Sequence, residues 1–93
     1  MSKEFYTYVL LSKRDDKLYV GQTENIERRL QLHNNGKVLS TKHRRPFILV
    51  RAEKYKTRSE AYKSEQYLKS GQGREWLQKY LNDLPAYGGR KNL

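Results

Sequence analysis

The sequence contains no cysteine among its 93 residues. Disulfide bonds, catalysis by a cysteine thiolate and zinc sites built from cysteine are therefore excluded. It also lacks any apolar run approaching the ~20 residues that a membrane-spanning helix needs. The apolar stretch within the N-terminal segment MSKEFYTYVLL is too short for the core of a signal peptide. A cytoplasmic protein without a membrane partner is the expectation that fits these absences.

Acidic residues are scarce relative to basic ones. Asp and Glu together number 10 against 20 for Lys and Arg, which gives a formal net charge of +10. On so small a domain this charge creates a broadly positive field, which favours polyanionic partners such as nucleic acid. The charge also fits a protein that uses it only for solubility, or one that binds the ribosome or another anionic surface. Hydrophobic residues make up 35% and charged residues 32%, which indicates a globular rather than a disordered chain.

The pattern of apolar and polar residues predicts one small domain over residues 1–93. Its fold class is α/β (α+β), and its elements follow the order β-β-α-β-α-α. Strands are expected where β-branched and aromatic residues dominate, at residues 5–12, 18–21 and 47–55. The continuous apolar run FILV in the last of these is typical of a central strand. Residue patterns alone leave a three-stranded sheet that is mixed or antiparallel.

Three helices are expected, beginning near Ile26, after Thr57 and at Arg74. Asn25 is the predicted N-cap of the first, which ends near residue 34. Thr57 and Glu60 form a capping box for the second, and Gly71 is expected to stop it within a helix–helix turn. Pro85 ends the third, and the tail at 85–93 is expected to be loose.

Two polar residues flank the apolar stripe of the first helix. At 100° per residue, Ile26 and Leu30 define the stripe, and Arg29 and His33 lie along one of its borders. Such a pair points the same way and is partly desolvated, as a site that handles phosphate requires. The alternative is that Arg29 extends its stem over the core and that His33 is an ordinary border residue.

A carboxylate falls inside the apolar arc of the second helix. Ala61, Tyr62 and Leu68 set that arc, and Glu65 lies within it rather than at its edge. A carboxylate that faces the core is costly unless it is paired, protonated or bound to a cation. One carboxylate with waters and substrate phosphates suits Mg²⁺, which keeps much of its hydration shell. Glu65 is therefore the candidate metal ligand, and the alternative is a buried salt bridge to Arg29 or a lysine.

Tyrosine is abundant, with eight residues in the chain. Tyr6 and Tyr8 share one face of the first strand, and Tyr19 lies in the second. Most tyrosines are expected to pack as amphipathic core residues. A phenol beside Arg29 and a bound metal would lose its proton more easily, because nearby positive charge favours the phenolate. Such a phenol could then accept a proton from water.

A basic segment, KVLSTKHRRP, lies between the first helix and the third strand. Its five basic side chains are Lys37, Lys42, His43, Arg44 and Arg45. Segments of this kind contact phosphates and position a nucleic acid rather than specify its sequence. The alternative is an ordinary solvated loop.

Several short motifs occur in a recognisable order. YTY at residues 6–8, LYVG at 18–21, Arg29 ten residues after Tyr19, and Glu65 on a later helix resemble the GIY-YIG nuclease superfamily. ERRLQLHNNG is similar to the first helix of that family. RSEAYKSEQYLKSGQGREWL is similar to the end of its small stand-alone members, named excinuclease-subunit-C-like or UPF0213-like. The resemblance covers roughly residues 5–81.

The resemblance implies a three-stranded antiparallel sheet flanked by helices, and a metal-dependent endonuclease that hydrolyses DNA phosphodiester bonds. Tyr19 matches the general base or water-orienting phenol, and Tyr8 the phenol that positions water and phosphate. Arg29 would stabilise charge on the phosphoryl oxygens. Glu65 would hold one ion, Mg²⁺ or Mn²⁺, and His33 would contact phosphate or relay a proton.

The sequence also departs from the family pattern. YTY lacks the glycine and isoleucine of the name motif. Gln22 stands where the excision-repair relatives carry a lysine near the scissile phosphate, so a nucleic-acid contact from Gln22 lacks that charge. Gly21 is expected to let its strand and the first helix approach closely.

Three functions follow from these observations. The first is a DNA endonuclease, structure-selective and linked to repair or recombination, acting on branched, nicked or single-stranded DNA. The second is a domain of the same fold that binds nucleic acid but does not cut it. The third, supported by charge alone, is a basic RNA-binding or ribosome-associated protein. Tyr8, Tyr19, Arg29 and Glu65 are all intact, which favours the enzyme.

Overall fold

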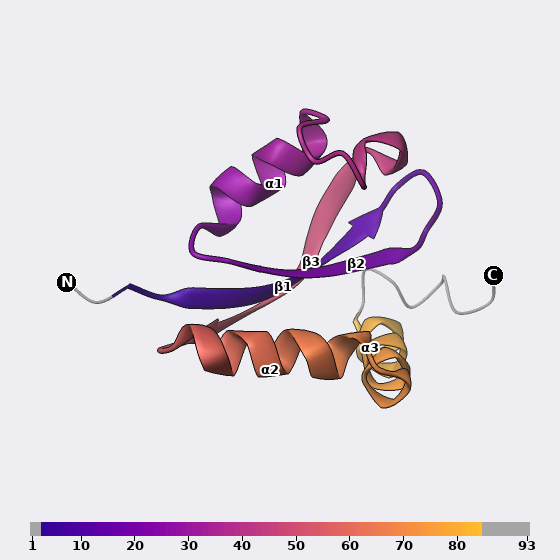
Figure 1. Cartoon of the computed structure of the whole chain (residues 1–93). Coiled ribbons are helices and arrows are strands. Elements are labelled where there is room, and N and C mark those ends of the chain that lie inside the picture. The colour runs from indigo at the N-terminus through magenta and orange to yellow at the C-terminus, as the bar shows by residue number, and fades with distance from the viewer. Residues whose placement is uncertain (1–2, 85–93) are drawn as a thin grey trace.

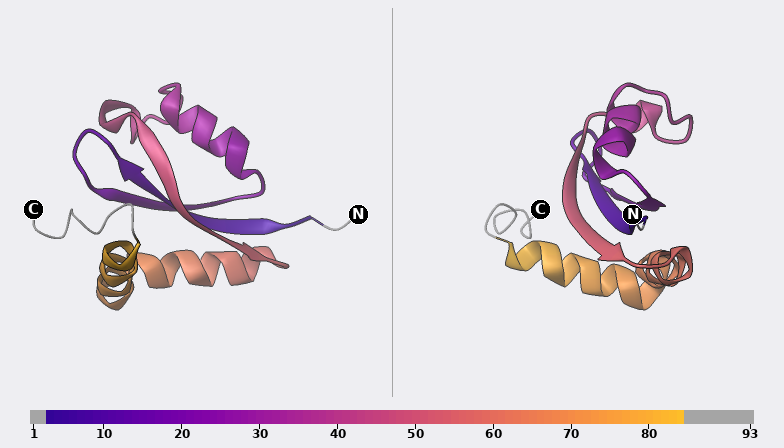
Figure 2. Two further views of the ribbon diagram at one scale, coloured as in Figure 1. Left: turned by 180° about the vertical axis from the view of Figure 1, so that it is seen from behind. Right: turned by 90° about the vertical axis from the view of Figure 1, so that its left-hand side faces the viewer.

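A sheet forms the middle layer of the molecule, with one helix on one face and two on the other (Figure 1). This computed structural model describes residues 3–84, and the tail predicted at 85–93, with Pro85, lies outside them. Figure 2 shows the same layers from behind and from the side. The elements are β1 (Phe5–Ser12), β2 (Leu18–Thr23), α1 (Ile26–Asn34), the 3₁₀ turn η1 (Lys42–Arg44), β3 (Phe47–Tyr55), α2 (Arg58–Lys69) and α3 (Gly71–Asp83).

The α/β (α+β) fold class, the order β-β-α-β-α-α and the antiparallel sheet are confirmed. Strand β1 is the central strand, and its residues 7–12 are all buried. The expectation that FILV marks the central strand is wrong. That run belongs to β3 at the sheet edge, where Ile48 and Leu49 are 37% and 38% exposed. Strand β2 continues to Thr23, beyond its predicted end at Gly21.

Alternate side chains of β1 face two separate cores. On the side of α1, Tyr8 and Leu10 pack with Phe47 of β3. On the side of α2 and α3, the buried cluster consists of Val9, Val20, Leu68 and Leu77. Thr7 also faces α2, and its hydroxyl donates to the carbonyl oxygen of Ala61 at 2.9 Å. Successive residues of β1 therefore pack against helices on opposite faces of the sheet.

Side-chain caps fix where α1 and α2 begin. The Asn25 side chain accepts a backbone hydrogen bond at the start of α1, as predicted. Thr57 and Glu60 form the predicted capping box of α2. Across residues 3–84, no helix is both long enough and apolar enough to cross a membrane.

The turn between α2 and α3 is tighter than the sequence predicts. Ser70 ends α2, and its hydroxyl accepts a hydrogen bond from the Gly73 amide at 3.2 Å, so the same residue caps α3. The expectation that Gly71 stops α2 is wrong, because Gly71 is the first residue of α3 and GQG lies in its first turn. A Cβ atom on Gly73 would overlap the carbonyl oxygen of Tyr67. Glycine at this position therefore allows the two helices to meet closely.

Two aromatic side chains of α2 and α3 are well exposed, although one of them, Tyr62, was expected within the apolar arc of its helix. Tyr62 is 53% and Trp76 is 39% exposed. Trp76 stacks on Tyr80, with ring centroids 5.4 Å apart, and the Arg51 guanidinium lies 4.8 Å from the Trp76 ring centroid. The apolar faces of α2 and α3 are thus narrower than their composition suggests.

Candidate active site

The phenol of Tyr8 lies on the α1 face of the central strand. Tyr8 is 2% exposed, and Gly21 is its register partner on β2. A Cβ atom on Gly21 would lie 2.5 Å from the Tyr8 hydroxyl oxygen, which is closer than real Cβ contacts come. Gly21 therefore makes room for this phenol. The expected role of Gly21, a close approach to α1, is wrong, because its close neighbour is a tyrosine of the same sheet.

Side-chain hydrogen bonds connect Tyr8 to α1 and to the segment that follows it. Arg29 Nε donates to the Tyr8 hydroxyl at 3.3 Å, and that hydroxyl lies 3.1 Å from His33 Nε2. On the other side of the ring, His33 Nδ1 lies 2.8 Å from Thr41 Oγ1. Thr41 in turn donates to the Val38 carbonyl oxygen at 3.4 Å. One series of hydrogen bonds thus links β1, α1 and the segment that follows α1.

Burial and charge set the protonation states in this group. Burial raises the pKa of the Tyr8 phenol, and the hydrogen bond from Arg29 opposes that rise; the charges of Tyr19 and Glu65 add to it. The pKa of Arg29 is raised, chiefly by its hydrogen bond to Tyr8. Burial, with the charge of Arg29, lowers the pKa of His33 to about 4. At neutral pH the group therefore consists of a cationic arginine, a neutral phenol and a neutral imidazole.

These protonation states give the hydrogen bonds a direction. A guanidinium has no acceptor, so the Tyr8 oxygen accepts from Arg29. A protonated, buried phenol needs an acceptor of its own, and His33 Nε2 is in place to be that acceptor. The neutral imidazole then carries its proton on Nδ1 and donates to Thr41, which donates to Val38. The series runs one way, from Arg29 to Val38.

His33 lies deeper than the sequence predicts. The prediction that His33 lies at the border of the stripe is wrong, because His33 is 0% exposed and is the fully buried residue of α1. Its ring packs edge-on against Tyr19 and Phe47, with centroids 4.9 and 5.7 Å apart. Complete burial leaves no access for a direct phosphate contact, and a relay role stays a proposal. Thr41 was not anticipated, since no sequence pattern links a hydroxyl in the basic segment to this histidine.

Glu65 faces strand β2 and has two hydrogen-bonding partners. Its side chain is 12% exposed. Gln22 Nε2 donates to Oε1 at 3.0 Å, and Lys69 Nζ lies 2.6 Å from Oε2. The ion pair with a lysine, which the sequence left open as an alternative, is therefore present. Lys69 was not singled out beforehand, although its place four residues after Glu65 is the spacing of helical ion pairs.

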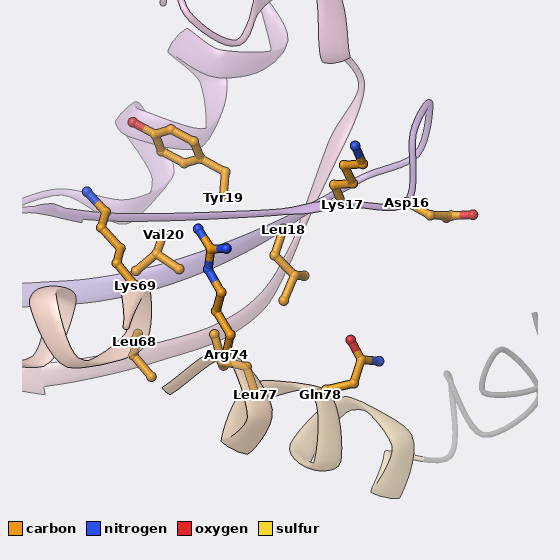
Figure 3. A pocket seen from close by; sticks show the side chains of 10 residues that line it. All are labelled: Asp16, Lys17, Leu18, Tyr19, Val20, Leu68, Lys69, Arg74, Leu77 and Gln78. Atoms are coloured by element: carbon orange, nitrogen blue, oxygen red, sulfur yellow. The ribbon is translucent and has the colours of Figure 1, made fainter. Parts of the chain in front are cut away.

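The candidate residues gather on both sides of the edge strand β2. Gly21 and Tyr19 face α1, where Tyr8 lies, whereas Gln22 faces α2 and reaches Glu65. Figure 3 shows Tyr19 on one side of β2 and Lys69 on the other. The structure thus brings the motif residues together around one strand, with phenols on one face and the carboxylate on the other.

The basic segment is only partly available to a ligand. Arg44 Nε pairs with Asp15 Oδ2 at 2.8 Å, and Arg44 also donates to the Leu18 carbonyl oxygen at 3.3 Å. The hydrogen bond from Arg44 is the main reason why the pKa of Asp15 falls to about 2. Arg45 donates from Nε to the Lys42 carbonyl oxygen at 2.8 Å and remains exposed. Arg44 therefore ties this segment to the β1–β2 hairpin.

A known protein family matches the part of the chain that carries these candidate residues. A model of the GIY-YIG catalytic domain matches residues 4–80. The chain belongs to the GIY-YIG family. The match includes every strand and all the motif positions described above, and it confirms the resemblance seen in the sequence. A nuclease is the activity that membership in this family suggests.

Relatives of this GIY-YIG chain are small proteins of similar length. A UPF0213 protein of Bacillus licheniformis is 43% identical over 70 residues, covering 74% of this chain and 72% of that protein. One from Enterococcus faecalis is 47% identical over 66 residues, covering 68% and 74%. The solution NMR structure of a UPF0213 protein from Bacillus halodurans is 32% identical, with a TM-score of 0.52, and the match covers 83% of this chain and 84% of that one. These names state no activity, substrate or metal.

DNA binding by this GIY-YIG domain is expected to weaken with salt, because each neutralised phosphate releases counterions. Replacing Lys37, Lys42 and Arg45 together by alanine should flatten the slope of log affinity against log salt by about two to three units if all three contact phosphate. Fluorescence anisotropy with labelled DNA at several salt concentrations measures the slope. A control with the same charge change replaces Lys56, Lys63 and Lys79. An equal loss of slope in both variants would show that the segment has no special role.

The stability of the domain is expected to fall as the pH drops from about 6.5 to about 4. Because the pKa of His33 is lowered from 6.5 to about 4, the unfolded chain binds a proton in this window that the folded chain does not. The contribution is fully present above pH 6.5 and amounts to about 3 kcal/mol. Urea unfolding between pH 4 and 7 should show this dependence in the wild type and lose it in His33→Gln. Parallel pH profiles of the two proteins would contradict the assignment.

Proposed function

We propose that this domain is a metal-dependent DNA endonuclease that hydrolyses phosphodiester bonds. The observation that carries the proposal is the meeting of Tyr8, Tyr19 and Arg29 on one face of β2 with Glu65 at the same strand. A guanidinium, two phenols and a carboxylate placed around one edge strand are groups that can serve phosphoryl transfer to water. A role in DNA repair or recombination and a cytoplasmic location stay predictions.

Each side chain has a distinct task in the proposed reaction. Tyr19, half-buried beside Tyr8, orients the attacking water or takes its proton. The buried and protonated Tyr8 holds Arg29 in place. The guanidinium of Arg29, whose Nε donates to the Tyr8 hydroxyl at 3.3 Å, stabilises the charge that develops on the phosphoryl oxygens. His33 acts through Tyr8, as a positioning residue.

The donor set fits a single hard cation held by one carboxylate. Within residues 3–84, no group of three His, Asp or Glu side chains is arranged to hold a metal. Glu65 would be the protein ligand of Mg²⁺ or Mn²⁺, and water and phosphate oxygens would complete the shell. Its carboxylate is shielded but not closed off, and Lys69, 48% exposed, is free to turn toward solvent. When bound, such an ion supplies Lewis-acid stabilisation of the phosphoryl group.

One observation favours the alternative of a binding module that does not cut. Lys69 already neutralises Glu65 at 2.6 Å, as a cation would. A domain in which this ion pair is permanent would bind nucleic acid through its positive charge alone. The two functions therefore differ in whether a divalent cation displaces Lys69.

The experiment that tests the proposed function is incubation with a panel of branched, nicked and single-stranded DNAs, each with Mg²⁺, Mn²⁺ or EDTA. Cleavage with either metal and none with EDTA is the expected result. Binding to the same DNAs without cleavage under any condition would support the binding module. Preference for RNA over every DNA in the panel would favour the RNA-binding alternative.

Arg29→Lys is expected to reduce the cleavage rate on the order of a hundredfold. Lysine keeps the charge but loses the planar fork, so one ammonium cannot bond to Tyr8 and also reach two phosphoryl oxygens. Cleavage kinetics with saturating DNA measure the effect. Arg28→Lys is the matched control, because Arg28 is the exposed neighbour on the same helix. A change of only a few-fold in Arg29→Lys, with normal DNA affinity, would place Arg29 outside the site.

A further inference from the structure

A cleft lies beside Lys69, the ion-pair partner of Glu65. It lies between β2 and the helices α2 and α3 and has a volume of about 560 Å³, within the range of small-ligand pockets. Figure 3 shows it from close by, with β2 on one side and the two helices on the other. Of the candidate catalytic residues Tyr8, Tyr19, Arg29, His33 and Glu65, only Tyr19 lines this cleft.

The walls of the cleft combine an apolar surface with basic side chains, and the one acidic residue of the lining, Asp16, points away from Lys69 and Arg74 (Figure 3). The apolar side chains are Leu18, Val20, Leu68 and Leu77. Lys69 and Arg74 extend from the helices toward β2, whereas Lys17 points away from them (Figure 3). Among residues 3–84, Arg74 forms no ion pair with a carboxylate. A ligand that suits these walls has a flat apolar part and an anionic part.

We propose that this cleft is a nucleotide-binding subsite, which holds one base and its phosphate in the strand on which the candidate active site acts. The base lies on the apolar wall, and the phosphate accepts hydrogen bonds from Arg74 and Lys69, as charge-assisted phosphate contacts do. Sequence preference is not expected, because an apolar wall and two cations distinguish no base edge. The identity of the ligand as a polynucleotide rests on the proposed function, whereas the chemistry of the cleft does not.

Lys69 links the subsite to the candidate active site. Its ammonium lies 2.6 Å from Glu65 Oε2 and its side chain also lines the cleft. A phosphate bound by Arg74 therefore lies near the carboxylate proposed to hold the cation. The same phosphate offers Lys69 a partner when Glu65 takes up a divalent ion. Binding in the cleft and metal binding at Glu65 are thus expected to support each other.

The test uses the thymidine dinucleotide pTpT as probe, with the ¹⁵N-labelled full chain followed by NMR. Addition of pTpT should shift backbone amide signals at residues 17–20 and 68–78, with weak, saturable binding. Lys69→Gln/Arg74→Gln should weaken this binding about tenfold or more, since two charge-assisted hydrogen bonds are lost. The matched control is Lys63→Gln/Lys79→Gln, which removes the same charge from the same two helices outside the cleft.

Three outcomes would overturn the subsite: shifts confined to other residues, an equal loss of affinity in the control variant, or inorganic phosphate binding as tightly as pTpT. The last of these would mean that the apolar wall contributes nothing. The proposed function is judged separately, by DNA cleavage. Binding of pTpT in the cleft by a protein that cuts no DNA would leave the subsite in place and remove the endonuclease proposal.

Discussion

Glu65→Gln is expected to abolish DNA cleavage while leaving the fold intact. The substitution removes the negative charge proposed to hold the cation and keeps the shape of the side chain. An amide at this position still offers an oxygen to Gln22, whose Nε2 lies 3.0 Å from Oε1. Loss of the partly exposed ion pair with Lys69 should cost at most about 1 kcal/mol of stability. Cleavage assays with Mg²⁺ and Mn²⁺, together with thermal unfolding, measure both effects.

Metal binding and DNA binding separate the possible causes of such a loss. Titration of Mn²⁺ followed by electron paramagnetic resonance should show binding to the wild type and not to Glu65→Gln. DNA affinity should survive or increase, because a negative charge near phosphate is removed. Glu75→Gln, an exposed position on α3, serves as the control for the loss of one carboxylate. Cleavage by Glu65→Gln at the wild-type rate would show that Glu65 holds no cation needed for cleavage and that its ion pair with Lys69 is only structural.

Tyr19→Phe is expected to reduce the cleavage rate by about a hundredfold or more at every pH, the range attributed to a positioned acid or base. Phenylalanine keeps the ring, so the edge-on packing against His33 at 4.9 Å and the contact with Tyr8 remain. Only the hydroxyl is lost. Metal and DNA affinity should therefore change little, and single-turnover kinetics across a pH series should reveal the loss in the chemical step.

Other tyrosines supply the controls for this result. Tyr62→Phe and Tyr67→Phe change exposed phenols on α2 and should cut DNA like the wild type. Tyr8→Phe is a different case, because it leaves Arg29 and His33 without their shared partner and should also lower stability. If Tyr19→Phe behaves like the α2 controls, the phenol is structural, and water activated by the cation becomes the better source of the nucleophile.

Local sequence signals predicted where most helices and strands lie, but not which elements pack beside one another. Helix α1 and the capping box at Thr57 and Glu60 lie where expected, because a cap and an apolar stripe are encoded within a few residues. The edge position of β3 was missed, since an apolar run such as FILV carries no information on the order of strands in the sheet. The cap at Ser70 was missed for a related reason, because Gly71 reads as a stop until the next helix is seen to begin there.

The candidate site shows the same limit. Residue spacing brought Arg29, Tyr8 and Tyr19 into one hypothesis, and the structure brings them into contact. Three contacts of the other site residues were not predicted: Thr41 with His33, and Lys69 and Gln22 with Glu65. The contacts of Thr41 with His33 and of Gln22 with Glu65 join distant segments through tertiary geometry, whereas Lys69 lies one helical turn after Glu65 and has a periodic signal in the sequence. The depth of His33 was also not predicted, because its complete burial depends on the rings of Tyr8, Tyr19 and Phe47, which come from three different strands and pack around it.

The series of hydrogen bonds that runs from Arg29 to Val38 determines how the Tyr8 hydroxyl can bond to a molecule that enters the site. Because the Tyr8 hydroxyl donates its proton to His33 Nε2, its oxygen can only accept a further hydrogen bond. A water molecule admitted beside it must turn a hydrogen toward that oxygen, and its own lone pairs then point elsewhere. In the proposed hydrolysis, the electron pair that attacks phosphorus would thereby be aimed before any base acts. In the proposed site, the buried imidazole would thus set the orientation of that water through the polarity of the Tyr8 phenol.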